Sequence, residues 1–264
     1  MSKNRCVLLD TDFISKLYAT KIDDSDRFIQ RIICIDSFHY ACHVQTIKEI
    51  NNYDPSIANW IDANDSIRVY TDRDLLSILI DNFGQMAFIY FLNILKKSCT
   101  TFSSKYYDKH YGTLKEYQID FWSKWTIDDF LSILEKCDEE VGRDNNLGEI
   151  KLYSTAQILE VLSIEELYIF CSDDRKARSV MSKQSIDCVS ALASFYLAKN
   201  YLHMSKEYAQ VFFDSWMALH RNQKCFQIYS ESGYQLERVP GQDIFDMFYE
   251  NKLDLQKDGF FKRK

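Results

Sequence analysis

Hydrophobic and polar positions change along the chain in blocks that predict strands and helices in alternation. Two short runs, residues 6–9 and 168–171, are apolar throughout and suit strands that are buried on both faces of a sheet. Residues 38–43, 66–70 and 185–189 are further strand candidates. Helical spacing fills most of the intervals between them, at 13–18, 28–35, 44–50, 149–162, 175–183, 190–203 and 206–220. Strands that alternate with helices predict an α/β fold with a parallel sheet.

The interval from about residue 54 to about 143 is predicted to be mostly helical, and residues 225–239 resemble a terminal strand pair. With only 7 Gly and 2 Pro, the chain has little material for a flexible linker. We therefore expect one domain over residues 1–264. Its core would span about 1–53 and 144–250, with a helical insertion at about 54–143 and a C-terminal extension at about 251–264.

The composition of the chain excludes some classes of protein. A hydrophobic share of 46% supports a large core, and a net charge of −7 argues against a protein that coats nucleic acid by charge alone. The eight cysteines are scattered without a CxxC pair, and the most apolar long window, residues 75–95, contains Asp81, Asn82, Gln85 and Asn93. These features predict a cytoplasmic protein with reduced thiols.

Acidic residues follow the predicted strands. Asp10 and Asp12 follow the first apolar run, and Asp173 and Asp174 follow the second. Glu49 and Glu149 lie close to predicted helix starts. Because the carboxyl ends of parallel strands meet at one edge of a sheet, these acids are expected to converge there. Carboxylates that are packed together favour a hard cation such as Mg²⁺ or Mn²⁺.

Each acid also has a structural interpretation. Thr46 and Glu49 have the spacing of a capping box, as do Asn146 and Glu149, and Asp12 or Asp173 could cap the helix that follows it. Asp10 is different, because it ends a buried strand and precedes the predicted helix by too much to be an ordinary cap. Several acids that all lie at strand-to-helix transitions are therefore stronger evidence for a cation site than any one of them alone.

These segments, in this order, resemble the successive motifs of PIN domains. The segments are Leu-Leu-Asp-Thr-Asp-Phe-Ile at 8–14, Thr-Ile-Lys-Glu at 46–49, Asn-Leu-Gly-Glu at 146–149 with Ala156, and Ile-Phe-Cys-Ser-Asp-Asp-Arg-Lys-Ala-Arg at 169–178. PIN domains are Mg²⁺- or Mn²⁺-dependent ribonucleases that include the VapC-like toxins of bacterial toxin–antitoxin pairs. The resemblance covers about residues 5–55 and 144–250.

The resemblance implies a PIN-like α/β/α sandwich in which Asp10, Glu49, Glu149 and Asp174 are catalytic metal ligands. Asp173 is an adjacent candidate for the fourth acid. One or two ions would activate a water for attack on a phosphodiester and leave 5′-phosphate and 3′-hydroxyl ends. Two departures from the family pattern stand out: Glu49 and Glu149 are 100 residues apart (149 − 49), and Leu152 stands where a further acid is often found.

The expected substrate is RNA, single-stranded or structured. Arg175, Lys176 and Arg178 could hold its phosphates, although a solvated helix face explains them equally well. An antitoxin or other protein partner and a homo-oligomer are further expectations. Lysines and aromatic residues also interleave at 96–125, but Tyr107, Tyr111, Leu114, Gln118, Trp122 and Trp125 form a helical stripe that favours packing.

Two alternatives belong to other classes. Asp10 and Asp12 also resemble the first motif of haloacid-dehalogenase-like phosphatases, in which the first Asp is the nucleophile, but the Lys motif of that family is not evident. The other alternative is a non-catalytic PIN-like interaction domain whose acids serve as helix caps.

Overall fold

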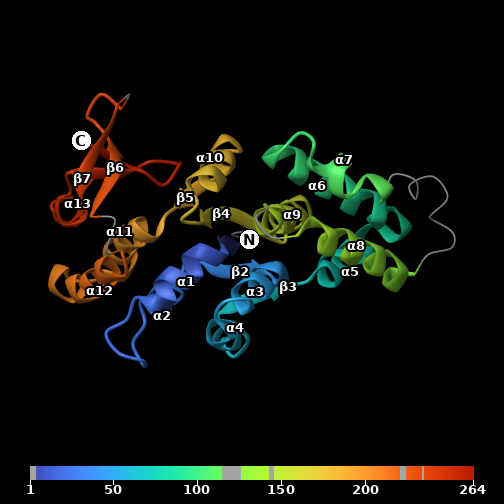
Figure 1. The fold of residues 1–264 in the computed structure, drawn as a ribbon, viewed down its shortest axis with the longest axis horizontal. Coiled ribbons are helices and arrows are strands. Elements are labelled where there is room, and N and C mark those ends of the chain that lie inside the picture. Colours follow the sequence, from blue (N-terminus) through green and yellow to red (C-terminus); the bar gives the residue numbers. More distant parts are fainter. Residues whose placement is uncertain (1–3, 115–125, 143–145, 221–223, 234) are drawn as a thin grey trace.

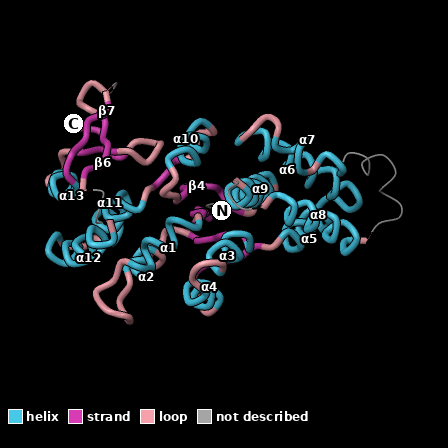
Figure 2. Tube along the Cα trace, viewed as in Figure 1, coloured by secondary structure: helices cyan, strands magenta, loops and turns pink. Residues whose placement is uncertain are grey.

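A five-stranded parallel sheet forms the centre of the protein. The computed structural model describes residues 4–114, 126–142, 146–220, 224–233 and 235–264. The strands are β1 (Asn4–Leu9), β2 (His39–His43), β3 (Ile67–Tyr70), β4 (Glu165–Cys171) and β5 (Asp187–Val189), in the order β3-β2-β1-β4-β5. Figure 2 shows the strands in magenta among the helices in cyan. The predicted α/β fold class with a parallel sheet is confirmed.

Helices cover both faces of this sheet, as an α/β/α sandwich requires. Figure 1 shows α9 (Leu147–Val161) and α10 (Arg175–Lys183) on one side, and α1 (Thr11–Ala19), α2 (Phe28–Ile32) and α11 (Ala191–Leu202) on the other. Further helices pack around these: α3 (Val44–Asn51) and α4 (Pro55–Asp62) against each other, and α12 (Lys206–Leu219) against α1 and α11.

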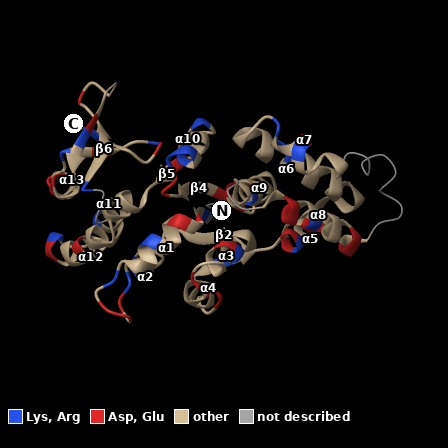
Figure 3. Ribbon diagram, viewed as in Figure 1, with Lys and Arg blue, Asp and Glu red and all other residues tan. Residues whose placement is uncertain are grey.

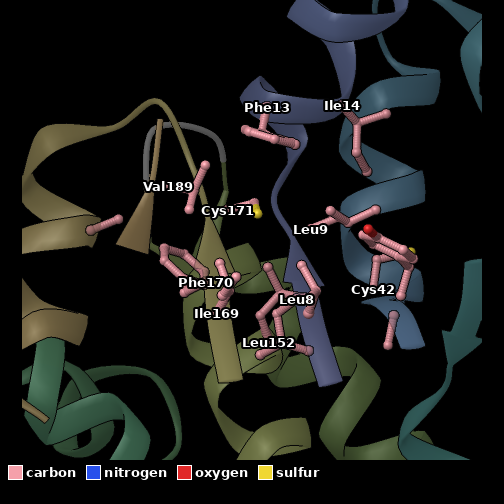
Figure 4. Close-up of a cluster of buried hydrophobic side chains, with 14 of the residues drawn as sticks. Leu8, Leu9, Phe13, Ile14, Cys42, Leu152, Ile169, Phe170, Cys171 and Val189 are labelled. Carbon is pink, nitrogen blue, oxygen red and sulfur yellow. The ribbon is translucent and has the colours of Figure 1, made fainter. Parts of the chain in front are cut away.

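The two apolar runs of the sequence are the central strands β1 and β4. Leu8 pairs with Phe170 and Leu9 with Cys171, and the side chains of all four are buried. Figure 4 shows them in the core together with Leu152 of α9. Both strands are apolar throughout because helices cover both of their faces. Leu152 therefore belongs to the core, which explains why this position holds no acid.

The insertion is mostly helical, as predicted. It contains α5 (Asp72–Phe83), the short η1 (Gly84–Met86), α6 (Ala87–Phe102), α7 (Tyr106–His110) and α8 (Ile127–Val141), while β3 is an edge strand of the main sheet. Tyr107, Tyr111 and Leu114 are buried, so the described part of the aromatic stripe packs in the core. Gln118, Trp122 and Trp125 lie outside the described residues.

One helical stretch in the described part of the chain, Asp72–Phe102, is long and apolar enough to cross a membrane by length and composition alone. Gly84 interrupts it with a φ of 54°, in the region that favours glycine. Leu79 and Leu95, from its two halves, are buried inside the protein. Part of its apolar character therefore serves the packing of the insertion.

The C-terminal region forms a second sheet. The predicted strand pair is confirmed as β6 (Cys225–Tyr229) and β7 (Leu236–Pro240), which are antiparallel. After α13 (Gly241–Tyr249), the strands β8 (Leu253–Leu255) and β9 (Phe261–Arg263) complete the order β7-β6-β9-β8. β8 and β9 have three residues each, which is too short for a periodic pattern to reveal them.

A buried lysine joins the insertion to the core. Lys151 of α9 is 1% exposed, and its Nζ lies 2.8 Å from Asp72 Oδ2 on α5 and 2.7 Å from Asp138 Oδ2 on α8. Burial lowers the pKa of Lys151, but the two carboxylates more than offset this effect and raise it above its ordinary value. The ammonium is thus held charged between two helices of the insertion.

Replacing Lys151 by Met is expected to lower the free energy of unfolding by about 3–5 kcal/mol, because two partly buried carboxylates lose their cation. The measurement is urea denaturation at pH 7. The triple variant Lys151→Met, Asp72→Asn, Asp138→Asn should recover much of the loss, since no charge is then left unpaired. A Lys151→Met protein within about 1 kcal/mol of the wild type would contradict the role given to this ion network.

Candidate functional site

A cavity of about 620 Å³ lies where β1 and β4 end. These two strands form the topological switch point of the sheet: from β1 the strand order runs outward through β2 to β3, and from β4 it runs outward in the opposite direction to β5. Open α/β sheets bind ligands at such switch points. The described residues that line the cavity are Asp10, Thr11, Asp12, Gln45, Glu49, Asn52, Tyr53, Gly142, Glu149 and Asp174.

Four of the five predicted acids therefore lie around one cavity. Asp10 follows β1, Glu49 lies on α3, Glu149 on α9 and Asp174 at the start of α10, so four separate segments contribute. The fifth acid, Asp173, does not line this cavity. The convergence of the four follows from the parallel sheet, as the sequence suggested.

Asp10 is the most buried of these acids, with 5% of its surface exposed. Contrary to the sequence-based expectation, it occupies the N-cap position of α1, but its side chain makes no capping hydrogen bond. It accepts a hydrogen bond from Ser172 Oγ at 2.7 Å. Burial raises the pKa of Asp10 to about 7 against the opposing effect of that hydrogen bond, and the charges of Glu49 and Asp12 add to the rise.

Glu49 is held by residues from two helices. Thr11 Oγ1 donates to its Oε2 at 2.8 Å, and Gln45 Nε2 donates to its Oε1 at 3.3 Å. A Cβ at position 148 would lie only 2.8 Å from Oε2, so Gly148 lets the start of α9 approach the carboxylate closely. Burial raises the pKa of Glu49, while the hydrogen bonds from Thr11 and Gln45 oppose the rise.

The capping-box interpretation of Thr46 and Glu49 is wrong. Helix α3 already begins at Val44, and the ring of His43 accepts the capping hydrogen bond from Gln45 N at 3.1 Å. The start at Val44 agrees with the helical spacing predicted at 44–50, whereas a capping box at Thr46 would have begun the helix at residue 47. The capping box was considered because threonine is a more usual cap than histidine. Glu49 is thus not engaged at the helix start and is directed to the cavity lining.

Glu149 lies in the first turn of α9, and Asn146 at the N-cap position makes no side-chain capping bond. Burial, followed by the nearby charge of Asp10, raises the pKa of Glu149 to about 8. Asp10 and Glu149 therefore resist ionising together unless positive charge is brought between them.

The structure separates the roles of Asp173 and Asp174. Asp174 caps α10 through its Oδ1, which accepts from the backbone N–H groups of Lys176 and Ala177. Asp173, expected as a cap, instead pairs with Lys16 at 2.5 Å and accepts from Ala191 N at 3.0 Å. Burial would raise the pKa of Asp173, but Lys16 more than offsets this and the pKa is lowered. Asp174 is the better candidate for a metal ligand.

No Lys, Arg or His is among the described residues that line the acidic cavity. Its buried acids therefore lack the internal cation that Lys151 supplies elsewhere. Across the described ranges, however, no three His, Cys, Asp or Glu side chains are already arranged around one point as metal ligands. Mg²⁺ is commonly held by one or two carboxylates and several waters, and this cavity has the volume and the oxygen donors for that arrangement.

Several lining residues were missed from the sequence. Gln45, Asn52 and Tyr53 lie four residues before, three after and four after Glu49, so helical spacing around Glu49 would have found them. Asp12, which was not predicted as a metal ligand, shares the cavity with Asp10.

The three predicted phosphate-binding residues have different surroundings. Arg175 and Lys176 are exposed on the first turn of α10. Arg178 is 5% exposed and donates to the backbone oxygens of Ser172 at 2.9 Å and Asp258 at 3.1 Å. Arg178 therefore positions the end of β4 against the C-terminal sheet, while the other two remain available to a ligand.

Comparison with known proteins does not assign the chain to a family. No protein-family model matches the sequence, and neither a curated protein nor a solved structure matches it.

Proposed function

We propose that the protein is a PIN-type hydrolase, a metal-dependent endoribonuclease that cleaves RNA phosphodiesters with the help of Mg²⁺ or Mn²⁺. The observation that carries the proposal is the convergence of Asp10, Glu149 and Asp174, with Glu49, on one cavity whose described lining has no cationic side chain. Such a set of oxygen donors suits a hard divalent cation. Asp10 and Glu149, with their raised pKa values, would gain most from it.

In this mechanism, Asp10, Glu149 and Asp174 would hold the cation, and the chemistry it would supply when bound is the activation of a water for in-line attack on phosphorus. Ser172 positions two of these groups: its hydroxyl donates to Asp10 at 2.7 Å and accepts from Asp174 N at 3.0 Å. Glu49, fixed by Thr11 and Gln45, can accept a proton from a water in the cavity.

The surroundings of the cavity suit RNA. Tyr53 lies in the lining and is more than half exposed, so its ring can stack on a base. Arg175 and Lys176, next to Asp174, can bind flanking phosphates. The proposal includes a cytoplasmic location, which the scattered cysteines favour. It also includes an antitoxin or other protein partner, which the resemblance to VapC-like toxins implies, and a homo-oligomer.

Purified protein is expected to cleave single-stranded RNA with Mn²⁺ or Mg²⁺ and not with EDTA. Asp10→Asn should lower the rate on the order of a hundredfold or more, because the side chain loses the charge that faces the cation. Asp187→Asn, an exposed change on β5, is the matched control and should keep the wild-type rate.

A folded Asp10→Asn protein that cleaves RNA at the wild-type rate would refute this assignment. Metal-dependent hydrolysis of a phosphomonoester without RNA cleavage would favour the phosphatase alternative, in which Asp10 is the nucleophile. If neither substrate reacts and Mn²⁺ does not stabilise the fold, the non-catalytic interaction domain is the better explanation.

The pH dependence of stability tests the electrostatics of the cavity. The pKa values of Asp10 and Glu149, about 7 and about 8, lie above those of unfolded carboxyls, near 4, so between pH 4 and 8 the folded state binds more protons. These two groups therefore reduce the stability of the metal-free protein as the pH rises. Mn²⁺ competes with those protons, so its effect on Tm should be larger at pH 8.5 than at pH 6.

The measurement is thermal unfolding with and without Mn²⁺ at both pH values. Asp10→Asn is the control, because it removes one of the two titrating carboxyls. In this variant, the increase in Tm caused by Mn²⁺ should differ less between pH 6 and pH 8.5. An increase in Tm that is the same at pH 6 and pH 8.5 would contradict the account of these carboxylates.

A further inference from the structure

A second cavity, of about 460 Å³, lies between the α/β core and the C-terminal sheet. Its lining comes from α1, α10, α11 and α12 on one side and from β6, β7 and the segment 259–261 on the other. The volume is within the range of small-molecule sites. This cavity is separate from the acidic one, but neighbouring residues line the two: Asp174 lines the acidic cavity and Asp173 lines this one.

The charge of this second cavity is opposite to that of the first. Four cationic side chains, Lys16, Arg175, Arg178 and Arg238, line it together with one acid, Asp173. The whole chain carries a charge of −7, so this concentration of positive charge is local. Figure 3 shows basic residues on α1, on α10 and around the C-terminal sheet. The lining therefore favours an anionic ligand.

The cations differ in how fully the protein uses them. Lys16 pairs with Asp173, and Arg178 donates to two backbone oxygens. Arg175 makes a hydrogen bond to Gln227 at 2.8 Å, with its guanidinium 5.1 Å from the ring centroid of Phe260. Arg238 is exposed and has no ion pair among the described residues. Arg175 and Arg238 therefore keep donors for an incoming phosphate.

Aromatic side chains form another wall of the same cavity. The ring centroid of Trp216 lies 5.2 Å from that of Phe226 and 4.3 Å from that of His220. Trp216 is 1% exposed, and its indole Nε1–H is buried without an acceptor among the described residues. A buried donor without a partner is costly, and an oxygen of a bound ligand would satisfy it. Phe226 and Phe260 are only half-buried, so they can contact a planar group.

Glycine at position 259 allows this arrangement. Gly259 has a φ of 79°, and a Cβ there would lie 2.9 Å from both Cδ and Nε of Arg178. Only glycine combines this backbone conformation with so close an approach. Arg178 can therefore bridge β4 and the segment before β9, which holds the two walls of the cavity together.

We propose that this second cavity is a subsite for one nucleotide of a single-stranded RNA, with its phosphate on Arg175 and Arg238 and its base beside Phe226. Cations and half-buried aromatic rings together are what single-strand binding requires, because the base must be unstacked to reach a ring. The inference rests on the proposed function in that the bound strand is the one whose cleavage the acidic cavity would catalyse.

The test is the binding of a fluorescently labelled eight-nucleotide RNA, followed by anisotropy in EDTA, so that neither metal nor cleavage enters the result. Arg238→Gln should weaken binding and reduce the slope of log K against log salt concentration by about 0.7, the value for one lost phosphate contact on a single strand. Phe226→Leu should weaken binding by between about fivefold and about a hundredfold through lost stacking.

Arg68→Gln is the matched control, since Arg68 is an exposed arginine on β3 at the opposite edge of the main sheet. It should bind RNA like the wild type. Wild-type affinity in both Arg238→Gln and Phe226→Leu, absence of RNA binding, or equal affinity for a duplex of the same sequence would overturn the inference. RNA binding that depends on these two residues, without Mn²⁺-dependent cleavage, would support the subsite and refute the proposed nuclease.

Discussion

The burial of like-charged carboxylates at the carboxyl edge of the sheet is the physical constraint that sets the chemistry of this protein. Charge taken out of water is costly unless an opposite charge accompanies it. The protein meets this requirement in two ways. Around Lys151, two aspartates share an internal ammonium. Ser172 donates a hydrogen bond to Asp10 and Thr11 donates one to Glu49, but no Lys, Arg or His is among the described residues that line the cavity, so the counterpart we propose is a cation from solution.

The sheet and the acidic cavity could be foreseen because both follow from strong local signals. The short apolar runs ending at Leu9 and Cys171 suited buried strands, although their periodicity alone did not separate strands from buried helix segments. Parallel pairing of these strands brings the acids that follow them to one edge. What could not be foreseen depends on contacts distant in sequence. Asp174 is a better candidate for a metal ligand than Asp173 because Asp173 pairs with Lys16, which is 157 residues away in sequence. The second sheet includes two strands of only three residues each, which give no periodic signal.

The C-terminal sheet gives the protein a second cavity next to the first. Arg178 donates to Ser172 O and Asp258 O, and so connects the end of β4, where the acids lie, to the segment before β9. The acidic and basic cavities are thereby fixed relative to the same short segment, residues 172–174. In the proposed function, a strand of RNA that enters both cavities would meet the acids proposed to hold the cation at one point and the arginines proposed to bind phosphate at the other.

The most direct test of the central claim is a crystal structure of the wild-type protein with Mn²⁺, measured for anomalous scattering. An anomalous peak is expected between Asp10, Glu149 and Asp174, with oxygen ligands at about 2.2 Å, the distance expected for a hard divalent cation. Well-ordered carboxylates with no Mn²⁺ between them at a saturating concentration, or a peak only at other residues, would contradict it.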